Sequence, residues 1–202
     1  GELATTLMAP AVDHVQRPLA RALQPRGPDD GRVERALRLG DEFRVFFRFD
    51  LRDIARSGKI YFRVLSDEQG YHCFFHKDFC SFFFDVSMSK TESKDYALLL
   101  PCNSFKPEIL CQTHFMTLRT LRHHCLLGDV DVWVLAEPLG LYRYEDVFRY
   151  PVANYDFPPS VAGPLTKREM RRRFRAWYER TGNRYDQIIG FLTGYYRRII
   201  VD

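Results

Sequence analysis

The chain has 202 residues, enough for one ordinary domain with a substantial core. Hydrophobic residues make up 46% and charged residues 28%, a balance that excludes a disordered chain. The net charge of +4 is uneven, because residues 164–202 hold ten Lys or Arg against four Asp or Glu. This basic carboxyl-terminal stretch is the most informative bulk feature of the sequence.

The sequence predicts no membrane partner and no secretory export. No run of about 18 apolar residues occurs, and the amino terminus lacks the basic start and apolar stretch of a signal peptide. The five cysteines are odd in number and irregularly spaced, unlike a disulfide framework. We therefore expect an intracellular protein in a reducing compartment, without distinguishing cytoplasm, nucleus and organelle matrix.

Two segments precede the basic end. Residues 1–32 contain four prolines and are predicted to form a proline-punctuated amino-terminal arm. Residues 33–163 are predicted to form a strand-rich core domain. Alternating or β-favouring residues predict its strands at 42–50, 59–65, 71–76, 79–87, 96–100 and 129–135.

Helices are expected mainly toward the carboxyl end. Pro107 and Gly128 mark the limits of one predicted helix, and residues 136–163 are predicted to be loop. Residues 164–202 are predicted to form a basic helical hairpin packed on the core. A capping box of Thr166 and Glu169 is expected to begin its first helix, and the second helix is expected after Gly182.

These elements predict an α+β fold, with a mostly antiparallel β-sheet of about five to seven strands and a C-terminal helical hairpin.

The first predicted binding surface is the basic face of the helix that begins near Thr166. At about 100° per residue, four arginines fall within one arc of that helix. Guanidinium groups match the geometry of phosphate oxygens, which favours a nucleic-acid or acidic partner. A solvated surface is the alternative, because helices commonly turn their charges outward. The four residues are Arg168, Arg171, Arg172 and Arg175.

The second predicted binding surface is one face of the expected sheet. Arginines interleaved with aromatic rings on an open sheet are typical of proteins that bind single strands, since bases stack on the rings. The alternative is that the helical hairpin covers this face, with the arginine stems packed beneath it. The residues are Arg44, Phe46 and Arg48, joined by Tyr61 and Arg63 if the two strands pair.

Residues suited to metal binding do not form a recognisable motif. Two groups of His and Cys, near residues 72–80 and 102–125, contain no C-x-x-C pair, so no metal is predicted. Asp129 and Asp131 share one face of the strand predicted at 129–135, a spacing suited to a divalent ion. Nucleotidyltransferases use a similar Asp-x-Asp strand, but the Gly-Ser turn that holds their triphosphate is missing here.

The sequence therefore favours binding over catalysis, with no catalytic residue and no cofactor predicted. We expect a non-enzymatic binding subunit of an intracellular complex, which contacts RNA or single-stranded DNA through its arginines and aromatic rings. A protein partner is expected as well, joined through the arm and aromatic loops. The alternatives are a pure protein–protein assembly module with aromatic interfaces, and metal-dependent phosphoryl or nucleotidyl transfer at Asp129 and Asp131.

Overall fold

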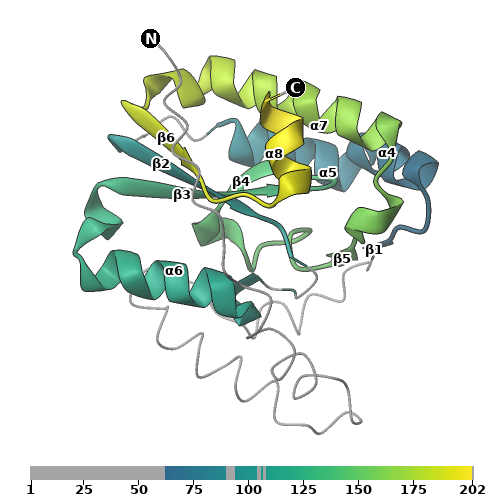
Figure 1. Cartoon of the computed structure of the whole chain (residues 1–202). Helices are drawn as coiled ribbons and strands as arrows, with labels where there is room; N and C mark the ends of the chain where they lie inside the picture. Colours follow the sequence, from purple (N-terminus) through teal and green to yellow (C-terminus); the bar gives the residue numbers. More distant parts are fainter. Residues whose placement is uncertain (1–61, 90–93, 104–105, 107, 202) are drawn as a thin grey trace, which may run out of the picture.

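In the computed structural model of the chain, the described residues are 62–89, 94–103, 106 and 108–201. The predicted arm at 1–32 and the predicted strand at 42–50 lie outside them. The described part is a mixed α+β structure with two sheets and five helices (Figure 1). None of its helices has the length and apolar character needed to cross a membrane.

The main sheet has four strands in the order β4–β3–β2–β6. Strand β2 spans Tyr96–Pro101, and both β3 (Val130–Ala136) and β6 (Gln187–Gly190) run parallel to it. Strand β4 (Gly140–Arg143) is antiparallel to β3. The prediction of a mostly antiparallel sheet with five to seven strands is therefore wrong for the described residues.

Helical connections explain why the strands are parallel. The chain leaves β2, forms helix α6 (Gln112–His123) and returns to β3, and it reaches β6 only after helix α7 (Pro164–Arg180). A connection that crosses from one end of a sheet to the other places the next strand parallel to the last. The second sheet is also parallel and pairs β1 (Phe62–Arg63) with β5 (Tyr155–Asp156).

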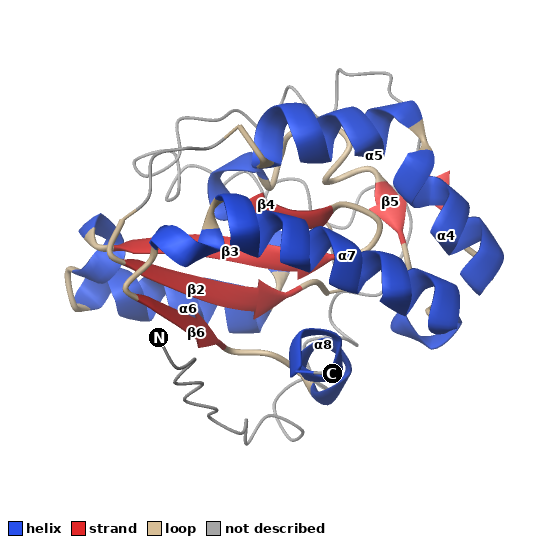
Figure 2. Cartoon of the chain, turned by 90° about the horizontal axis from the view of Figure 1, so that it is seen from above, coloured by secondary structure: helices blue, strands red, loops and turns tan. Residues whose placement is uncertain are grey.

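The main sheet is covered on both faces, with α6 on one side and α7 on the other (Figures 1 and 2). Successive residues of β2 and β3 alternate between two cores: Leu98 packs with the core that contains Leu118 of α6, and Leu99 packs with the core that contains Trp177 of α7. Strands buried on both faces have nearly continuous apolar sequences. This accounts for the sequence YALLLP of β2.

The predicted strands at 71–76 and 79–87 are helical in the structure. They form α4 (Asp67–Phe75), α5 (Lys77–Ser81) and a π-helix, η1 (Phe82–Ser87). Helix α4 begins where the side chain of Ser66 accepts a hydrogen bond from the Gln69 amide at 3.2 Å. The polar residues at the start of α4 are of types that also occur in hairpin turns, but here they form the first turn of a helix.

The remaining elements agree in part with the elements predicted from the sequence. A helix lies within the range predicted between Pro107 and Gly128, but α6 is shorter than predicted and has 3-10 turns before and after it. Two C-terminal helices exist, α7 and α8 (Gly194–Val201), but strand β6 lies between them where helix was expected. The short 3-10 helices are η2 (Glu108–Leu110), η3 (Leu126–Gly128), η4 (Tyr144–Asp146), η5 (Pro159–Val161) and η6 (Gly182–Arg184).

The start of α7 depends on a carboxylate from a distant part of the chain. Asp67 accepts hydrogen bonds from the backbone amides of Gly163, Leu165 and Thr166 at 2.8, 3.0 and 3.0 Å. Because Pro164 is the first helical residue, the helix begins before the predicted capping box, and Glu169 bonds to arginines instead. The capping-box prediction is therefore wrong.

Candidate functional site

The four arginines predicted on α7 lie together on its outer side. The inner side of the helix is buried and includes Met170 and Trp177, which pack against the main sheet. All four arginines are exposed, as the helical periodicity predicted. We call them the α7 arginine face: Arg168, Arg171, Arg172 and Arg175.

The four arginines of the α7 arginine face differ in whether another residue compensates their charge. Arg172 donates two hydrogen bonds to the carboxylate of Glu169, at 2.8 and 2.7 Å, so its charge is compensated. Arg171 reaches the carbonyl oxygen of Arg198 in α8 at 3.5 Å, which is long for a hydrogen bond. Arg168 and Arg175 form no hydrogen bond or ion pair with other described residues. Two of the four guanidinium groups thus keep their charge available to a partner.

A fifth arginine of α7 is structural. Arg173 is 1% exposed and donates to the carbonyl oxygens of Phe74, Pro138 and Leu139 and to Glu169. Burial lowers its pKa to about 10, against the opposing effect of Glu169, and the guanidinium group remains charged at neutral pH. Arg173 therefore fixes α7 to α4 and to the turn before β4, while its neighbours stay on the surface.

Of the predicted sheet surface, the structure describes Arg63 alone. Arg63 is exposed on β1, in the two-stranded sheet rather than on α7. The other members, Arg44, Phe46, Arg48 and Tyr61, lie outside the described residues.

A buried polar cluster that the sequence did not predict follows the carboxyl end of β2. Lys106 Nζ donates to Cys102 Sγ at 2.8 Å, to the Tyr155 hydroxyl at 3.0 Å and to the carboxylate of Glu108. The Lys106 side chain is 8% exposed and that of Glu108 is fully buried. We call these four residues the Lys106 cluster.

Groups from two further elements border the Lys106 cluster. His114 of α6 is buried, and its Nε2 lies 2.8 Å from the carbonyl oxygen of Pro101, so that nitrogen carries the proton. Glu137 follows β3 and accepts a hydrogen bond from the Tyr196 hydroxyl of α8 at 2.7 Å. Burial raises the pKa of Glu137. The cluster thus lies where the carboxyl ends of two parallel strands meet, a common position for ligand sites.

Burial and charge set the protonation states in the Lys106 cluster. Burial alone would lower the pKa of Lys106, but Cys102 and Glu108 beside it raise the pKa above its usual value. Burial raises the pKa of the Cys102 thiol, although Lys106 opposes that shift. At neutral pH the cluster therefore holds the ammonium group of Lys106 beside the neutral thiol of Cys102. Such an ammonium group would stabilise negative charge that develops on the sulfur or on Tyr155.

Recognising the cluster requires the direction of the strands, and the sequence pattern predicted an antiparallel sheet where the strands are parallel. Cys102 comes one residue after β2, and residues that follow a buried parallel strand lie at the edge where sites form. An antiparallel sheet carries no such implication. The usable signal was the pair of residues Cys102 and Lys106 directly after a fully apolar strand.

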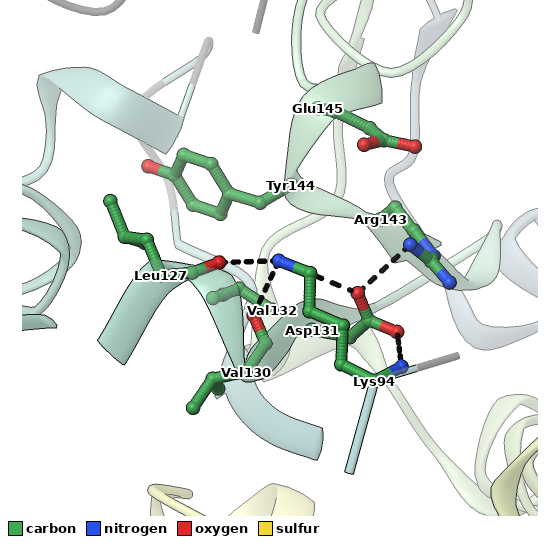
Figure 3. Close-up of a pocket in the computed structure, with 8 residues that line it drawn as sticks. All are labelled: Lys94, Leu127, Val130, Asp131, Val132, Arg143, Tyr144 and Glu145. Carbon is green, nitrogen blue, oxygen red and sulfur yellow. Dashed lines mark hydrogen bonds and ion pairs between the residues drawn. The ribbon is translucent and has the colours of Figure 1, made fainter. Parts of the chain in front are cut away.

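A pocket of about 150 Å³ lies at the opposite, amino end of β2 and β3 (Figure 3). Figure 3 shows Asp131 between Lys94 and Arg143, and the carboxylate accepts from the Lys94 amide and from Arg143 Nη1 at 3.1 and 2.9 Å. The Tyr185 hydroxyl donates to it at 2.9 Å. The pocket is lined by Lys94, Leu127, Val130, Asp131, Val132, Arg143, Tyr144 and Glu145.

These contacts decide whether Asp129 and Asp131 can bind a metal ion together. Asp131 is 3% exposed and already accepts from three donors, whereas Asp129 is exposed and precedes β3 rather than sharing a face with Asp131 in it. Across the described ranges, no group of three or more His, Cys, Asp or Glu is placed to hold a metal ion. The pocket is therefore best explained as an internal ion-pair network of the fold.

Residues 82–202 match a family model described as a domain of unknown function, DUF5591. The chain belongs to this family. No match to curated proteins or to solved structures is found. The DUF5591 stretch includes the main sheet, the α7 arginine face and most of the elements around the Lys106 cluster, whereas α4 and β1 precede it.

Proposed function

We propose that the chain is a non-enzymatic binding subunit of an intracellular complex and contacts RNA or single-stranded DNA through the α7 arginine face. One observation carries the proposal: Arg168 and Arg175 are exposed and have no partner among the described residues. The two residues are seven positions apart in the helix, a distance of about 10 Å along the axis. Two uncompensated guanidinium groups at this spacing favour a ligand with repeated negative charge.

The charge balance of the surrounding chain supports the same ligand class. Residues 164–202 carry ten basic and four acidic side chains, and Glu169, one of the four, is buried beneath Arg172. Binding through phosphates releases counterions from the nucleic acid, so affinity falls as salt rises.

Replacing the two uncompensated arginines tests the proposal. We expect Arg168→Gln/Arg175→Gln to weaken binding of a labelled single-stranded oligonucleotide about tenfold or more, because removing a hydrogen bond between charged groups costs about 1–2 kcal/mol. Fluorescence anisotropy with RNA and DNA strands of one sequence measures this. Both side chains are exposed, so the fold should be retained.

A double variant on the opposite side of the sheet is the matched control. Arg119→Gln/Arg122→Gln removes the same charge from exposed positions of α6, which covers the other face (Figure 1). The proposal expects this variant to bind nearly as the unaltered chain does. An equal decrease of affinity in the two double variants would show that net charge, not the α7 arginine face, governs binding.

A protein partner belongs to the same proposal. Phe84, Met116 and Leu126 are large apolar side chains that remain exposed by 43%, 46% and 42%. Phenylalanine and methionine are among the residues enriched at protein interfaces. If no nucleic acid binds the intact chain, a pure assembly module becomes the better account.

Catalysis at the Lys106 cluster is a second candidate function, because a buried lysine there contacts a thiol, a phenol and a carboxylate at once. Groups with perturbed pKa values at the end of a parallel strand are typical of reaction centres. In this account Cys102 is the nucleophile and Lys106 stabilises its thiolate.

Alkylation of Cys102 tests this second candidate. Lys106→Met/Glu108→Gln removes the buried ion pair without leaving one charge alone. We expect iodoacetamide to modify Cys102 more slowly in this variant than in the unaltered chain, because Lys106 lowers the pKa of the thiol more than Glu108 raises it. Exposed Cys125 is the internal control. Equal rates at Cys102 would remove Lys106 as an activator of the thiol.

A further inference from the structure

The outer side of helix α4 carries three adjacent rings. Gly70 and Phe74 face inward, and a Cβ atom at position 70 would lie 2.3 Å from the ring of Phe157. With 3.6 residues per turn, the residues on the other side of the helix face outward. They are Tyr71, His72 and Phe75, and we call them the α4 ring face.

The rings of the α4 ring face are in contact, and His72 and Phe75 are exposed whereas Tyr71 is partly buried. The centroids of Tyr71 and Phe75 are 5.1 Å apart in an edge-to-face arrangement, and those of Tyr71 and His72 are 5.9 Å apart. Phe75 is 50% exposed. A lone exposed apolar residue needs no explanation, but grouped exposed rings mark a contact surface.

The α4 ring face is held beside the α7 arginine face. Asp67, in the first turn of α4, accepts from three amides at the start of α7, and Arg173 of α7 donates to the Phe74 carbonyl oxygen at the other end of α4. Both views show α4 at the amino end of α7 (Figures 1 and 2). Helix α4 therefore runs alongside the first half of α7, from the start of α7 to Arg173.

We infer that the α4 ring face is a base-stacking platform for single-stranded RNA whose phosphates are held by the α7 arginine face. This inference rests on the proposed function and names its ligand more narrowly. Stacking on aromatic side chains and charge pairing along the backbone are the two interactions by which proteins hold single strands. The two faces supply one each, on helices that are fixed to one another.

The chemistry of the rings selects the ligand. In a duplex the bases are stacked on one another and are not accessible to the rings, so a single strand is the better ligand. The Tyr71 hydroxyl and the His72 imidazole add polar groups that would contact a ribose 2′-hydroxyl, which favours RNA over DNA.

Replacing the ring of Phe75 without removing its apolar character tests the inference. We expect Phe75→Leu to weaken binding of a labelled oligouridylate strand about tenfold, since each stacked base contributes on that scale, and Phe75→Trp to retain it. The salt dependence should be unchanged, because no charge is removed. Tyr96→Leu, at an exposed ring of β2 outside the α4 ring face, should bind as the unaltered chain does.

The outcomes separate this inference from the proposed function. If Arg168→Gln/Arg175→Gln weakens binding but Phe75→Leu does not, the stacking platform is wrong and the α7 arginine face stands. If the unaltered chain binds no strand, both fall. Equal dependence on Phe75 for a DNA strand of matching sequence would overturn the assignment to RNA. Loss of a copurifying protein from Phe75→Leu, with RNA binding intact, would show that the rings dock a protein instead.

Discussion

His114 shows how a single buried residue makes the fold sensitive to acid. Its Nε2 donates to Pro101, and its bare Nδ1 has no hydrogen-bond partner among the described residues. Burial lowers the pKa of His114 from 6.5 to about 4, and the charge of Lys106 acts in the same direction while Glu108 opposes it. The unfolded chain therefore takes up a proton between those pH values that the folded chain does not, and stability falls as pH falls through that range.

Replacing His114 tests the acid sensitivity. We expect His114→Gln, which keeps a donor for Pro101 but cannot titrate, to lose less stability between pH 6.5 and pH 4 than the unaltered chain. The difference should approach about 3 kcal/mol, since each pKa unit corresponds to about 1.4 kcal/mol. Urea denaturation at several pH values measures it. Identical pH profiles would show that the imidazole is not kept neutral.

At the scale of the element, the start of helix α7 is capped by a residue about a hundred positions away in sequence. Asp67 supplies the acceptor that an N-cap side chain normally provides, while the N-cap residue itself, Gly163, has no side chain. A Cβ atom at Gly163 would lie 2.5 Å from the Asp67 carboxylate, so the close approach requires glycine. The contact between Asp67 and the amides at the start of α7 therefore holds α4 and α7 together.

Removing this cap should destabilise the fold. We expect Asp67→Ala to lower the free energy of unfolding by about 1–2 kcal/mol, measured by urea denaturation, because three amides lose their acceptor. Burial would raise the pKa of Asp67, but hydrogen bonds from Thr166, Leu165 and Gly163 outweigh it and lower the pKa. The difference between the two proteins should therefore shrink in acid, where the carboxyl group becomes protonated. Glu68→Ala, at an exposed neighbour, should have little effect, and an equal loss of stability there would contradict the capping role.

The sequence predicted those elements whose pattern is local. Strands β2 and β3, helices α6 and α7 and the outward arc of arginines follow from hydrophobic periodicity over short windows. The aromatic run of α4, α5 and η1 was interpreted as strand because phenylalanine favours strands, although Phe82 and Phe83 pack into different cores of a helical segment. The packing of these rings in the folded chain determines that the segment is helical. A short window of sequence does not contain that information.

At the scale of the whole molecule, strand direction decides where the sites lie. The Lys106 cluster follows the carboxyl ends of parallel strands, the pocket of Figure 3 lies at their amino ends, and the α7 arginine face lies over one side of the sheet. Direction depends on which strands pair across long connections, and β2 pairs with strands more than thirty residues away. The sequence therefore predicted the exposed arginines but not the buried cluster.

The salt dependence of RNA affinity tests the central claim most directly. Measured by anisotropy on the intact chain, the logarithm of the association constant should fall linearly with the logarithm of the salt concentration. The slope should be at least as steep as about −1.4, which corresponds to two phosphate contacts on a single strand, and Arg168→Gln/Arg175→Gln should flatten it by a similar amount. An affinity that does not change with salt, or a slope that the double variant leaves unaltered, would contradict a role for the α7 arginine face.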